Sequence, residues 1–279
     1  MLSIIVSSYQ QSYFEKFSEN VNATIGDDFI YEIIQQWNPG VMGICEAYNK
    51  GAEKALYENL LFIHEDVLFE TKDWGEILIE HLSNISTGCI GVAGNAIKSH
   101  FPIAWWDIKE TEYLHLNQRM NDKKLIEKRL LTNNNEVVLL DGVFIGLRKN
   151  VWTEIKFNED LLKGFHAYDI DFSARVSKKY KNYVNNDILI THFSEGSPNK
   201  EWFIELTKVY TYTKEKMITD VSIRTNKLSK IELYFRYLRN FKFTKRSKII
   251  LFFKFYNPLE YTIKENQRIL KMFYYYTFK

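Results

Sequence analysis

Three groups of polar side chains in this chain could do chemistry. The triplet His64-Glu65-Asp66 interrupts the apolar stretch "LLFIHEDVLF" directly after a predicted strand, where a plain turn would use Gly, Asn or Pro. The segment "YDID" at 168–171 opens a predicted helix, and His192 follows a later strand. Because strands of an open α/β sheet bind ligands beyond their carboxyl ends, these groups are candidates for one common site.

The residue types point to a divalent cation. Mg²⁺ and Mn²⁺ prefer oxygen ligands, and Mn²⁺ also accepts imidazole, so Asp66 and His192 are suited to hold either ion. A bound diphosphate would supply the remaining ligands, and the ion would neutralise its charge, as a nucleotide-sugar donor requires. The alternative for each group alone is a capped helix or a solvated strand end.

The surrounding pattern predicts a wound α/β sheet that positions these groups. Short apolar runs at 2–7, 29–37, 59–63 and 88–95 read as strands, and amphipathic segments at 13–24, 43–55 and 73–85 read as helices between them. After residue 100 the alternation stops, and we predict a loop at 100–110 and a polar, mobile segment at 122–136. A further strand ends at Asp141-Gly142, and the chain is helical from about residue 200.

The overall composition limits the classes of protein to which this chain can belong. The 279 residues are 46% hydrophobic and 26% charged, which is ordinary for a globular chain. Cys45 and Cys89 are too few for a disulfide scaffold, which favours a reducing compartment. The N-terminus lacks the pattern of a signal peptide, and no apolar run approaches the roughly 18 residues of a membrane span. We therefore expect a cytoplasmic protein.

Charge divides the chain in two. From Arg224 to the end there are 14 Lys and Arg against 3 Glu, whereas the preceding residues carry 23 basic and 32 acidic side chains. The basic part also holds 15 aromatic residues, with Lys and Arg recurring every three to four positions. We predict a catalytic domain over 1–205 and a helical extension over 206–279 that docks reversibly on an anionic inner membrane face. The alternative is that its aromatics pack on the catalytic domain or on a second subunit, as in a homodimer.

The order of the motifs resembles the family 2 glycosyltransferases with the GT-A fold, particularly a bacterial branch with His at the first Asp of the DxD motif. The matching segments are "SIIVSSYQ", "EAYNKGAEKA", "FIHEDVLF", "DGVFIGLRKNVW", "FHAYDIDFSAR" and "THFSEGS", which together cover roughly residues 1–200. Two departures stand out: His64 replaces an Asp, and Tyr168 occupies the position of a Glu.

The resemblance implies a role for each matched position. Asp66 and His192 would bind Mn²⁺ or Mg²⁺, and Asp169 would be the general base of an inverting transfer from a nucleotide sugar. The nucleotide would contact a set of mostly polar residues, namely Ser7, Ser8, Tyr9, Gln36, Asn49 and Glu65. The donor sugar or the acceptor would lie against Trp105, Trp106, Asp141, Gly142 and Tyr168. A bacterial enzyme of this kind most often builds a surface polysaccharide on a saccharide or lipid-linked acceptor.

The choice of base rests on its place in the chain. Asp169 precedes a helix, whose positive end is expected to keep the carboxylate ionised and ready to accept a proton. Asp171 is the alternative base, although its spacing favours a pair with Arg175. Trp105 and Trp106 either cover the core or form a platform for a sugar ring.

Two other functions remain open from the sequence. A sugar nucleotidyltransferase also joins a wound sheet to carboxylates and a metal, but "SSYQQSYF" lacks the Gly of a phosphate loop. A non-catalytic carbohydrate- or nucleic-acid-binding protein would use the basic tail, yet it has no need of Asp66, Asp169 and His192 at separate element ends. We do not expect nucleic acid to be a partner.

Overall fold

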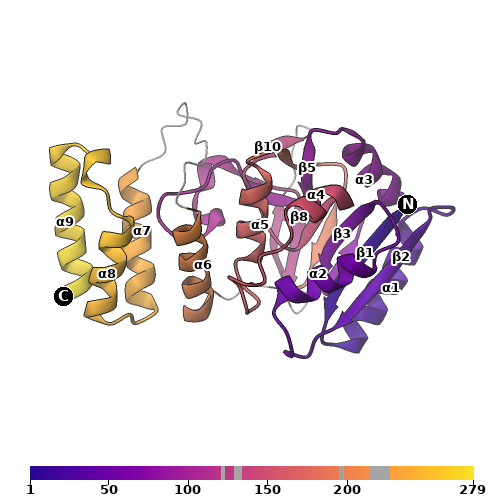
Figure 1. The fold of residues 1–279 in the computed structure, drawn as a ribbon, viewed down its shortest axis with the longest axis horizontal. Helices are drawn as coiled ribbons and strands as arrows, with labels where there is room; N and C mark the ends of the chain where they lie inside the picture. The colour runs from indigo at the N-terminus through magenta and orange to yellow at the C-terminus, as the bar shows by residue number, and fades with distance from the viewer. Residues whose placement is uncertain (121–122, 129–133, 195, 197, 214–226) are drawn as a thin grey trace.

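A computed structural model describes residues 1–120, 123–128, 134–194, 196, 198–213 and 227–279 (Figure 1). The strands are β1 (Leu2–Ser8), β2 (Tyr31–Trp37), β3 (Asn59–His64), β4 (Val67–Phe69), β5 (Thr87–Gly91), β6 (Ala93–Asn95), β7 (Glu112–Leu114), β8 (Leu116–Met120), β9 (Lys123–Lys128), β10 (Asn135–Val137), β11 (Leu139–Leu140), β12 (Phe144–Arg148), β13 (Lys181–Val184) and β14 (Ile190–His192). The α-helices are α1 (Gln11–Thr24), α2 (Ile44–Lys54), α3 (Trp74–Ser83), α4 (Lys149–Glu154), α5 (Tyr168–Val176), α6 (Lys200–Tyr212), α7 (Lys227–Asn240), α8 (Lys245–Phe255) and α9 (Ile263–Phe278). These elements confirm the predicted alternation of strands and helices up to residue 95.

The central sheet has seven strands in the order β10-β13-β5-β12-β3-β1-β2. β1 is parallel to β2 and β3, and β13 is parallel to β5, whereas β12 is antiparallel to both of its neighbours and β10 is antiparallel to β13. The sheet is therefore mostly parallel. This confirms the predicted fold class, and the helical C-terminal extension is also present.

Helices cover both faces of the central sheet because its strands are apolar on both sides. Ile4 of β1 lies beside Leu61 of β3, which pairs with Gly146 of β12, and Leu78 of α3 packs over this row. Ile5 points to the opposite face, where it meets Gly51 of α2. A Cβ at residue 51 would come within 2.3 Å of the Ile5 side chain, so only glycine lets the helix approach this closely.

The reversed strand β12 is what brings two distant polar segments together. It begins beside the end of β3, with Phe144 opposite Ile63, and the His64 amide donates to the Val143 carbonyl at 3.3 Å. Asp141 and Gly142, just before β12, therefore lie next to the His64 end of β3.

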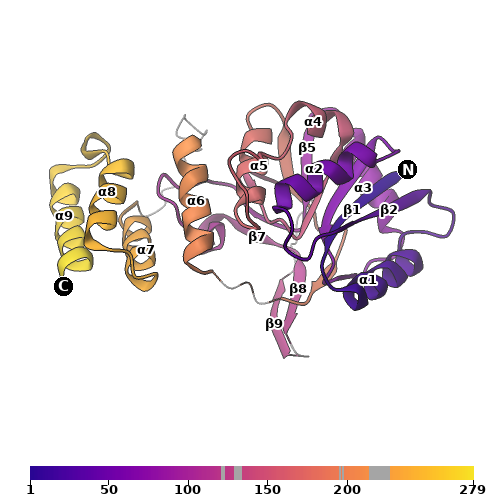
Figure 2. The ribbon, with the colours of Figure 1, turned by 60° about the horizontal axis from the view of Figure 1, so that its bottom comes forward.

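A second sheet, in the order β4-β14-β8-β9, continues from the end of β3. β14 pairs antiparallel with β4 so that His192 lies opposite Val67, and the Phe193 amide donates to the Asp66 carbonyl at 2.9 Å. β8 and β9 form a hairpin that projects from the body of the molecule (Figure 2). Within the segment 122–136, which was predicted to be polar and mobile, residues 123–128 and 135–137 form strands, and residues 122 and 129–133 lie outside the described part.

The extension has a hydrophobic core of its own. Buried side chains of α7, α8 and α9 pack together with Phe203 of α6 and with apolar residues of the 97–108 segment. Phe203 is fully buried, with its ring 5.5 to 6.0 Å from those of Tyr234, Tyr237, Phe241 and Phe243. Figure 1 shows these helices stacked beyond α6 at the end of the molecule opposite to α1 and β2. Many of the extension's aromatics thus pack within the chain, as the alternative reading proposed.

The helix α6 joins the two cores. It runs unbroken across residue 205, where the division between domains is predicted, and its Leu206, Val209 and Tyr210 belong to the core of the central sheet. A second link is made by Tyr237 of α7, whose hydroxyl donates to Asp107 Oδ2 at 2.5 Å. Within the described part of the chain no helix has both the length and the apolar character needed to cross a bilayer.

Phe203→Ala should reduce the free energy of unfolding by about 3–5 kcal/mol, because it empties the space at the centre of the second core. Phe253→Ala is the matched control: the ring of Phe253 on α8 is 63% exposed, and its loss should cost less than about 0.5 kcal/mol. Urea unfolding of the two variants measures the difference. Equal midpoints would show that Phe203 does not hold the second core together.

Candidate active site

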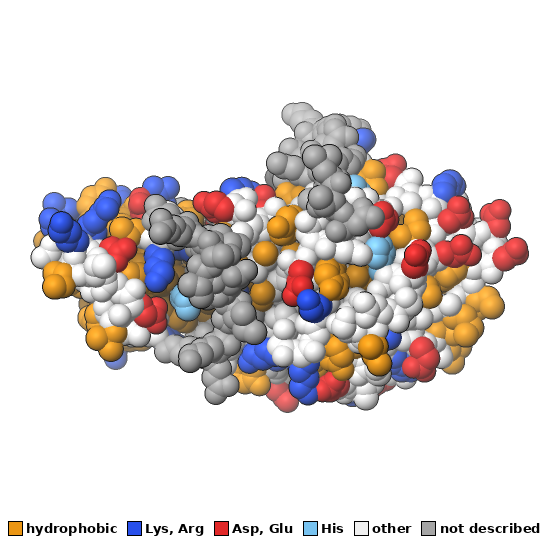
Figure 3. All heavy atoms as spheres, turned by 90° about the horizontal axis from the view of Figure 1, so that it is seen from above, with side chains coloured by type: hydrophobic (Ala, Val, Ile, Leu, Met, Phe, Trp, Pro, Cys, Tyr) orange, Lys and Arg blue, Asp and Glu red, His pale blue; other side chains and the backbone are white. Residues whose placement is uncertain are grey.

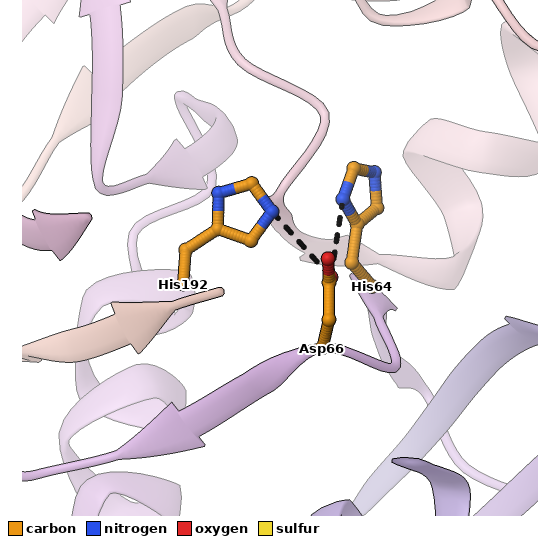
Figure 4. A group of neighbouring side chains, drawn as sticks. All are labelled: His64, Asp66 and His192. Carbon is orange, nitrogen blue, oxygen red and sulfur yellow. Dashed lines mark ion pairs between the residues drawn. The ribbon is translucent and has the colours of Figure 1, made fainter. Parts of the chain in front are cut away.

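The ends of β3 and β14 bring three side chains to one point. His64 ends β3, Asp66 follows two residues later, and His192 ends β14. A ligand atom from each lies within 4.8 Å of the others, and Figure 4 shows both imidazoles turned toward the Asp66 carboxylate. The distances to Asp66 Oδ1 are 3.9 Å from His64 Nδ1 and 3.4 Å from His192 Nε2.

The donor set fits a divalent cation. His192 Nε2 is buried without a hydrogen-bond partner among the described atoms, so its short distance to Asp66 lacks the geometry of a hydrogen bond. Burial alone would raise the pKa of Asp66, but the neighbouring His192 and His64 rings outweigh it and lower the pKa to about 2. Burial also lowers the pKa of His64. Two imidazoles and one carboxylate are a set that Mn²⁺ accepts.

Glu65, between two of these residues, points away from them. Its carboxylate accepts from the Tyr9 and Gln10 amides, at 3.1 and 3.2 Å, just before α1 begins. Amides at a helix N-terminus have no partner within the helix, so they can donate to the Glu65 carboxylate. These hydrogen bonds connect the end of β1 to the end of β3. Ser7, Tyr9, Glu65 and Asp66 line a cavity of about 190 Å³ there, together with Tyr13, Asn38, Ile44, Tyr48, His64, Phe165 and Tyr168.

A larger cavity of about 370 Å³ adjoins the other side of His64. Its lining includes His192, the loop residues Asp141 and Gly142, and Tyr168 and Asp169 from the start of α5. His64, Phe165 and Tyr168 line both cavities, which therefore meet at these three residues. The expected sugar-binding residues Trp105 and Trp106 also line the larger cavity.

Asp169 is a half-buried carboxylate beside a second one. Its Oδ2 accepts from the Gly142 amide at 3.1 Å, and burial, followed by the charge of Asp141, raises the pKa of Asp169 to about 7. The expectation that the helix end keeps Asp169 fully ionised was wrong, because desolvation exceeds the effect of the nearby amides. A carboxyl with this pKa is well suited to accept a proton near neutral pH.

Asp171, the alternative base, is engaged elsewhere. Its Oδ2 accepts from Arg175 Nε at 2.8 Å, and its side chain is buried, outside the lining of either cavity. The expected pairing with Arg175 is therefore confirmed.

The aromatic platform is built from two distant segments. Asn95 fixes its turn by donating to the carbonyls of Trp105 and Ile108 at 2.8 and 2.9 Å. Trp105 is almost fully buried, and the Trp106 ring stacks on Trp202 of α6 with centroids 5.7 Å apart and planes 29° apart. Trp105 and Trp106 thus cover the core and face the larger cavity at once.

Three of the expected nucleotide contacts point into the protein instead. The Asn49 amide donates to the Phe157 carbonyl and to Glu159, and accepts from Trp152 Nε1 and the Phe157 amide. Asn49 is thus buried, joins α2 to the segment after α4 by hydrogen bonds, and lines neither cavity. Ser8 and Gln36 are likewise buried and absent from both linings, and Ser8 accepts from Gln35 Nε2.

Sequence reasoning missed several residues that line the cavities. His64 was named in the candidate triplet and as a departure from the motif but not as a metal ligand, although its position two residues before Asp66, at the tip of a strand, was a signal for one. Phe165 and His166 lie just before α5, and Trp202 comes from the helix expected to lead into the extension. No sequence spacing identifies Phe165, His166 or Trp202 as cavity residues, because they reach the cavity through the packing of a loop and a helix.

A family model described as a glycosyltransferase-like family matches residues 3–221. The chain belongs to this family. No curated protein matches the sequence. The match confirms the resemblance to family 2 glycosyltransferases, whereas the placement in a branch with His at the first motif position stays a prediction.

Solved structures of glycosyltransferases share the fold. S. aureus TarS 1-349 is similar at TM-score 0.51 and 14% identity, over 99% of this chain and 80% of that chain. The mannosyltransferase PcManGT from Pyrobaculum calidifontis, in complex with GDP-Man and Mn²⁺, is similar at TM-score 0.51 and 10% identity, over 99% and 84%. GalNAc-T7 with UDP, GalNAc and Mn²⁺ is similar at TM-score 0.50 and 11% identity, over 98% and 55%. The fold of this glycosyltransferase-family protein is therefore GT-A.

Asp169→Asn should stabilise the protein at neutral and higher pH. The carboxyl has an ordinary pKa of 3.8 when unfolded and about 7 when folded, so the stability it contributes is complete below about pH 4 and is lost as the pH rises to 7. Asparagine stays neutral and still accepts from the Gly142 amide. We expect the variant's advantage in free energy of unfolding to grow between pH 4 and 7, to the order of a few kcal/mol, and then to level off.

Chemical denaturation at several pH values measures this advantage. Asp160→Asn, which removes a carboxylate with a fully exposed side chain, is the matched control and should show no such growth. A constant difference between wild type and Asp169→Asn across this range would mean that Asp169 titrates as an ordinary surface carboxylate.

Proposed function

We propose that the protein is a metal-dependent inverting glycosyltransferase. It moves a hexosyl group from a nucleotide sugar, with a UDP sugar favoured, to a hydroxyl of a saccharide or of a lipid-linked saccharide. The observation that carries the proposal is that His64 and His192, two members of the His64-Asp66-His192 cluster, line the same cavity as the raised-pKa carboxyl of Asp169. A cation-binding group and a proton acceptor facing the same space are the two parts that such a transfer needs.

The smaller cavity is proposed as the site of the nucleoside. Ser7, Tyr9 and Glu65 line it, and it reaches the metal cluster at His64 and Asp66. A nucleoside there would place its diphosphate beside the cluster. GalNAc-T7 with UDP and Mn²⁺ and PcManGT with GDP-Man and Mn²⁺ support a nucleotide and a cation as partners of this fold.

His64, Asp66 and His192 would hold Mn²⁺ or Mg²⁺, which supplies charge neutralisation for the leaving diphosphate. Asp169 would accept the proton of the acceptor hydroxyl while that oxygen forms a bond to the anomeric carbon from the face opposite the leaving group. The bond from this carbon to the diphosphate breaks, and the nucleoside diphosphate leaves with the electron pair. Direct displacement of this kind inverts the anomeric configuration.

The larger cavity is proposed to bind the sugars. Trp106 and Trp202 offer aromatic faces for the C–H side of a sugar ring, and Asp141 offers a carboxylate for its hydroxyls. We assign the product to the synthesis of a surface polysaccharide in the cytoplasm, as the family resemblance implies.

Asp66→Ala should abolish Mn²⁺-dependent binding of UDP, because the only carboxylate of the described cluster is lost. The fold should persist, since Asp66 caps no helix and fills no core position in the described structure. Titration calorimetry with UDP, with and without Mn²⁺, measures this. Asp160→Asn is the control for loss of one acidic residue and should bind as wild type does.

A product-release assay separates the rival functions. Incubation of the wild type with UDP sugars and Mn²⁺ should release UDP slowly, whereas a nucleotidyltransferase would release pyrophosphate from a nucleoside triphosphate and a pure binder would release nothing. Unchanged UDP affinity in Asp66→Ala would contradict the assignment of the metal site.

The outer surface of α8 and α9 is proposed to dock on an anionic membrane face. Ile250 and Phe253 are exposed on α8, and Ile263, Leu270, Tyr274 and Phe278 follow one stripe of α9 with 44–79% exposure. Residues 245–279 carry eight Lys and Arg against two Glu. Figure 3 shows basic and hydrophobic side chains interspersed at the end formed by the extension, and acidic ones gathered at the opposite end. Apolar side chains rimmed by cations suit a lipid surface, where each basic residue contributes about 1 kcal/mol.

Reversal of two charges should weaken this docking. Arg268 and Lys271 are exposed on α9, and their joint change to Glu should lower the partition onto anionic vesicles at least about thirtyfold at low salt, because each lost basic residue costs roughly 1 kcal/mol. Lys16→Glu with Lys163→Glu makes the same change of charge on the catalytic domain and is the control. Truncation at residue 205 would be a poor test, because it would cut α6.

Sedimentation with phosphatidylserine vesicles at low and high salt measures the partition. If the wild type ignores these vesicles at low salt, the membrane proposal is wrong. A dimer seen in the absence of lipid would assign the same surface to a second copy of the chain.

A further inference from the structure

The hydroxyl of Tyr168 contacts the His64 ring of the metal cluster on the side away from Asp66. Tyr168 opens α5, is almost fully buried, and places its hydroxyl oxygen 2.9 Å from His64 Nε2, the ring nitrogen that faces away from Asp66. The same hydroxyl lies 3.1 Å from the Gly142 carbonyl. His64 and Tyr168 are also the two positions at which the sequence departs from the motifs that it otherwise resembles.

The hydrogen bonds of the Tyr168 hydroxyl determine which ring nitrogen of His64 carries the proton. A carbonyl oxygen only accepts, so the single proton of Tyr168 is required by Gly142, and the hydroxyl oxygen is then left to accept from His64 Nε2–H. The opposite tautomer would deprive the Gly142 carbonyl of this proton. It would also place an Nδ1–H 3.9 Å from Asp66, beyond hydrogen-bond distance. Only the Nε2–H tautomer satisfies all of these groups.

We propose that Tyr168 is a positioning residue for the cation site: it holds His64 in the Nε2–H tautomer, so that Nδ1 presents a lone pair toward Asp66 and His192. This inference rests on the proposed metal dependence. A ligand histidine commonly donates its other N–H to a second group, which fixes the ring and strengthens binding. Here a buried phenol takes that place.

The absence of a side chain at residue 142 keeps the phenol in this role. A Cβ at residue 142 would lie 2.1 Å from the Tyr168 hydroxyl, so only glycine leaves room for it. Residue 142 is therefore expected to tolerate no side chain, for a reason connected with the metal site.

Tyr168→Phe tests the inference directly. It removes the acceptor for Nε2–H and keeps the ring, and it should weaken binding of Mn²⁺ alone by about 10- to 100-fold, measured by electron paramagnetic resonance of free Mn²⁺. Tyr210→Phe is the matched control. Its hydroxyl is also buried but donates to the Ile103 carbonyl at 3.4 Å, outside both cavities, and its loss should leave Mn²⁺ affinity unchanged.

A second measurement uses the unaltered chain. In ¹⁵N-histidine spectra of the metal-free wild type, long-range couplings should identify His64 as protonated at Nε2. A proton on Nδ1 would overturn the inference even if Tyr168→Phe failed to fold, and so would wild-type Mn²⁺ affinity in a folded Tyr168→Phe. If Asp66→Ala abolishes Mn²⁺ binding while Tyr168→Phe does not weaken it, the metal site stands and only the role of Tyr168 fails.

Discussion

The backbone of Gly142 is the point on which the site depends. Its amide donates to Asp169 and its carbonyl accepts from Tyr168, two consecutive residues at the start of α5. The reversed strand β12 brings Gly142 beside His64, so one backbone segment links the proposed base to the proposed metal ligand. A shift of this turn would move the proton acceptor and the cation site together.

The extension contributes to the same site from a distance. Trp202 stacks on Trp106 in the larger cavity and lies 5.6 Å from the ring of Tyr237 on α7, whose hydroxyl binds Asp107. The turn that carries Trp106 is thus held on one side by Asn95 in the catalytic core and on the other by the extension. If the outer helices dock on a membrane, this contact gives a physical connection between docking and the proposed acceptor site.

Much of this arrangement could be predicted from sequence, for identifiable reasons. The meeting of Asp66 and His192 was predicted from their residue types and from the motif resemblance. The second sheet was not, although it makes this contact by pairing β14 antiparallel with β4. The opposite orientation of Asn49 and Gln36 depends on which side of a helix or strand is buried, and the motif resemblance does not specify it. The pKa of Asp169 could not be foreseen, because it follows from the depth of burial and from Asp141, which lies 28 positions earlier in the chain. The second core also escaped prediction, since it unites residues from 97–108, 203 and 231–269.

Release of UDP from UDP sugars in the presence of Mn²⁺, followed from pH 5 to 9 in the wild type and in Asp169→Asn, tests the central claim most directly. A transfer that uses Asp169 as base predicts wild-type release that rises with an apparent pKa near 7, and release lowered by roughly a hundredfold or more in the variant. Equal release by the two proteins over this range, or a wild-type rate independent of pH, would contradict the account.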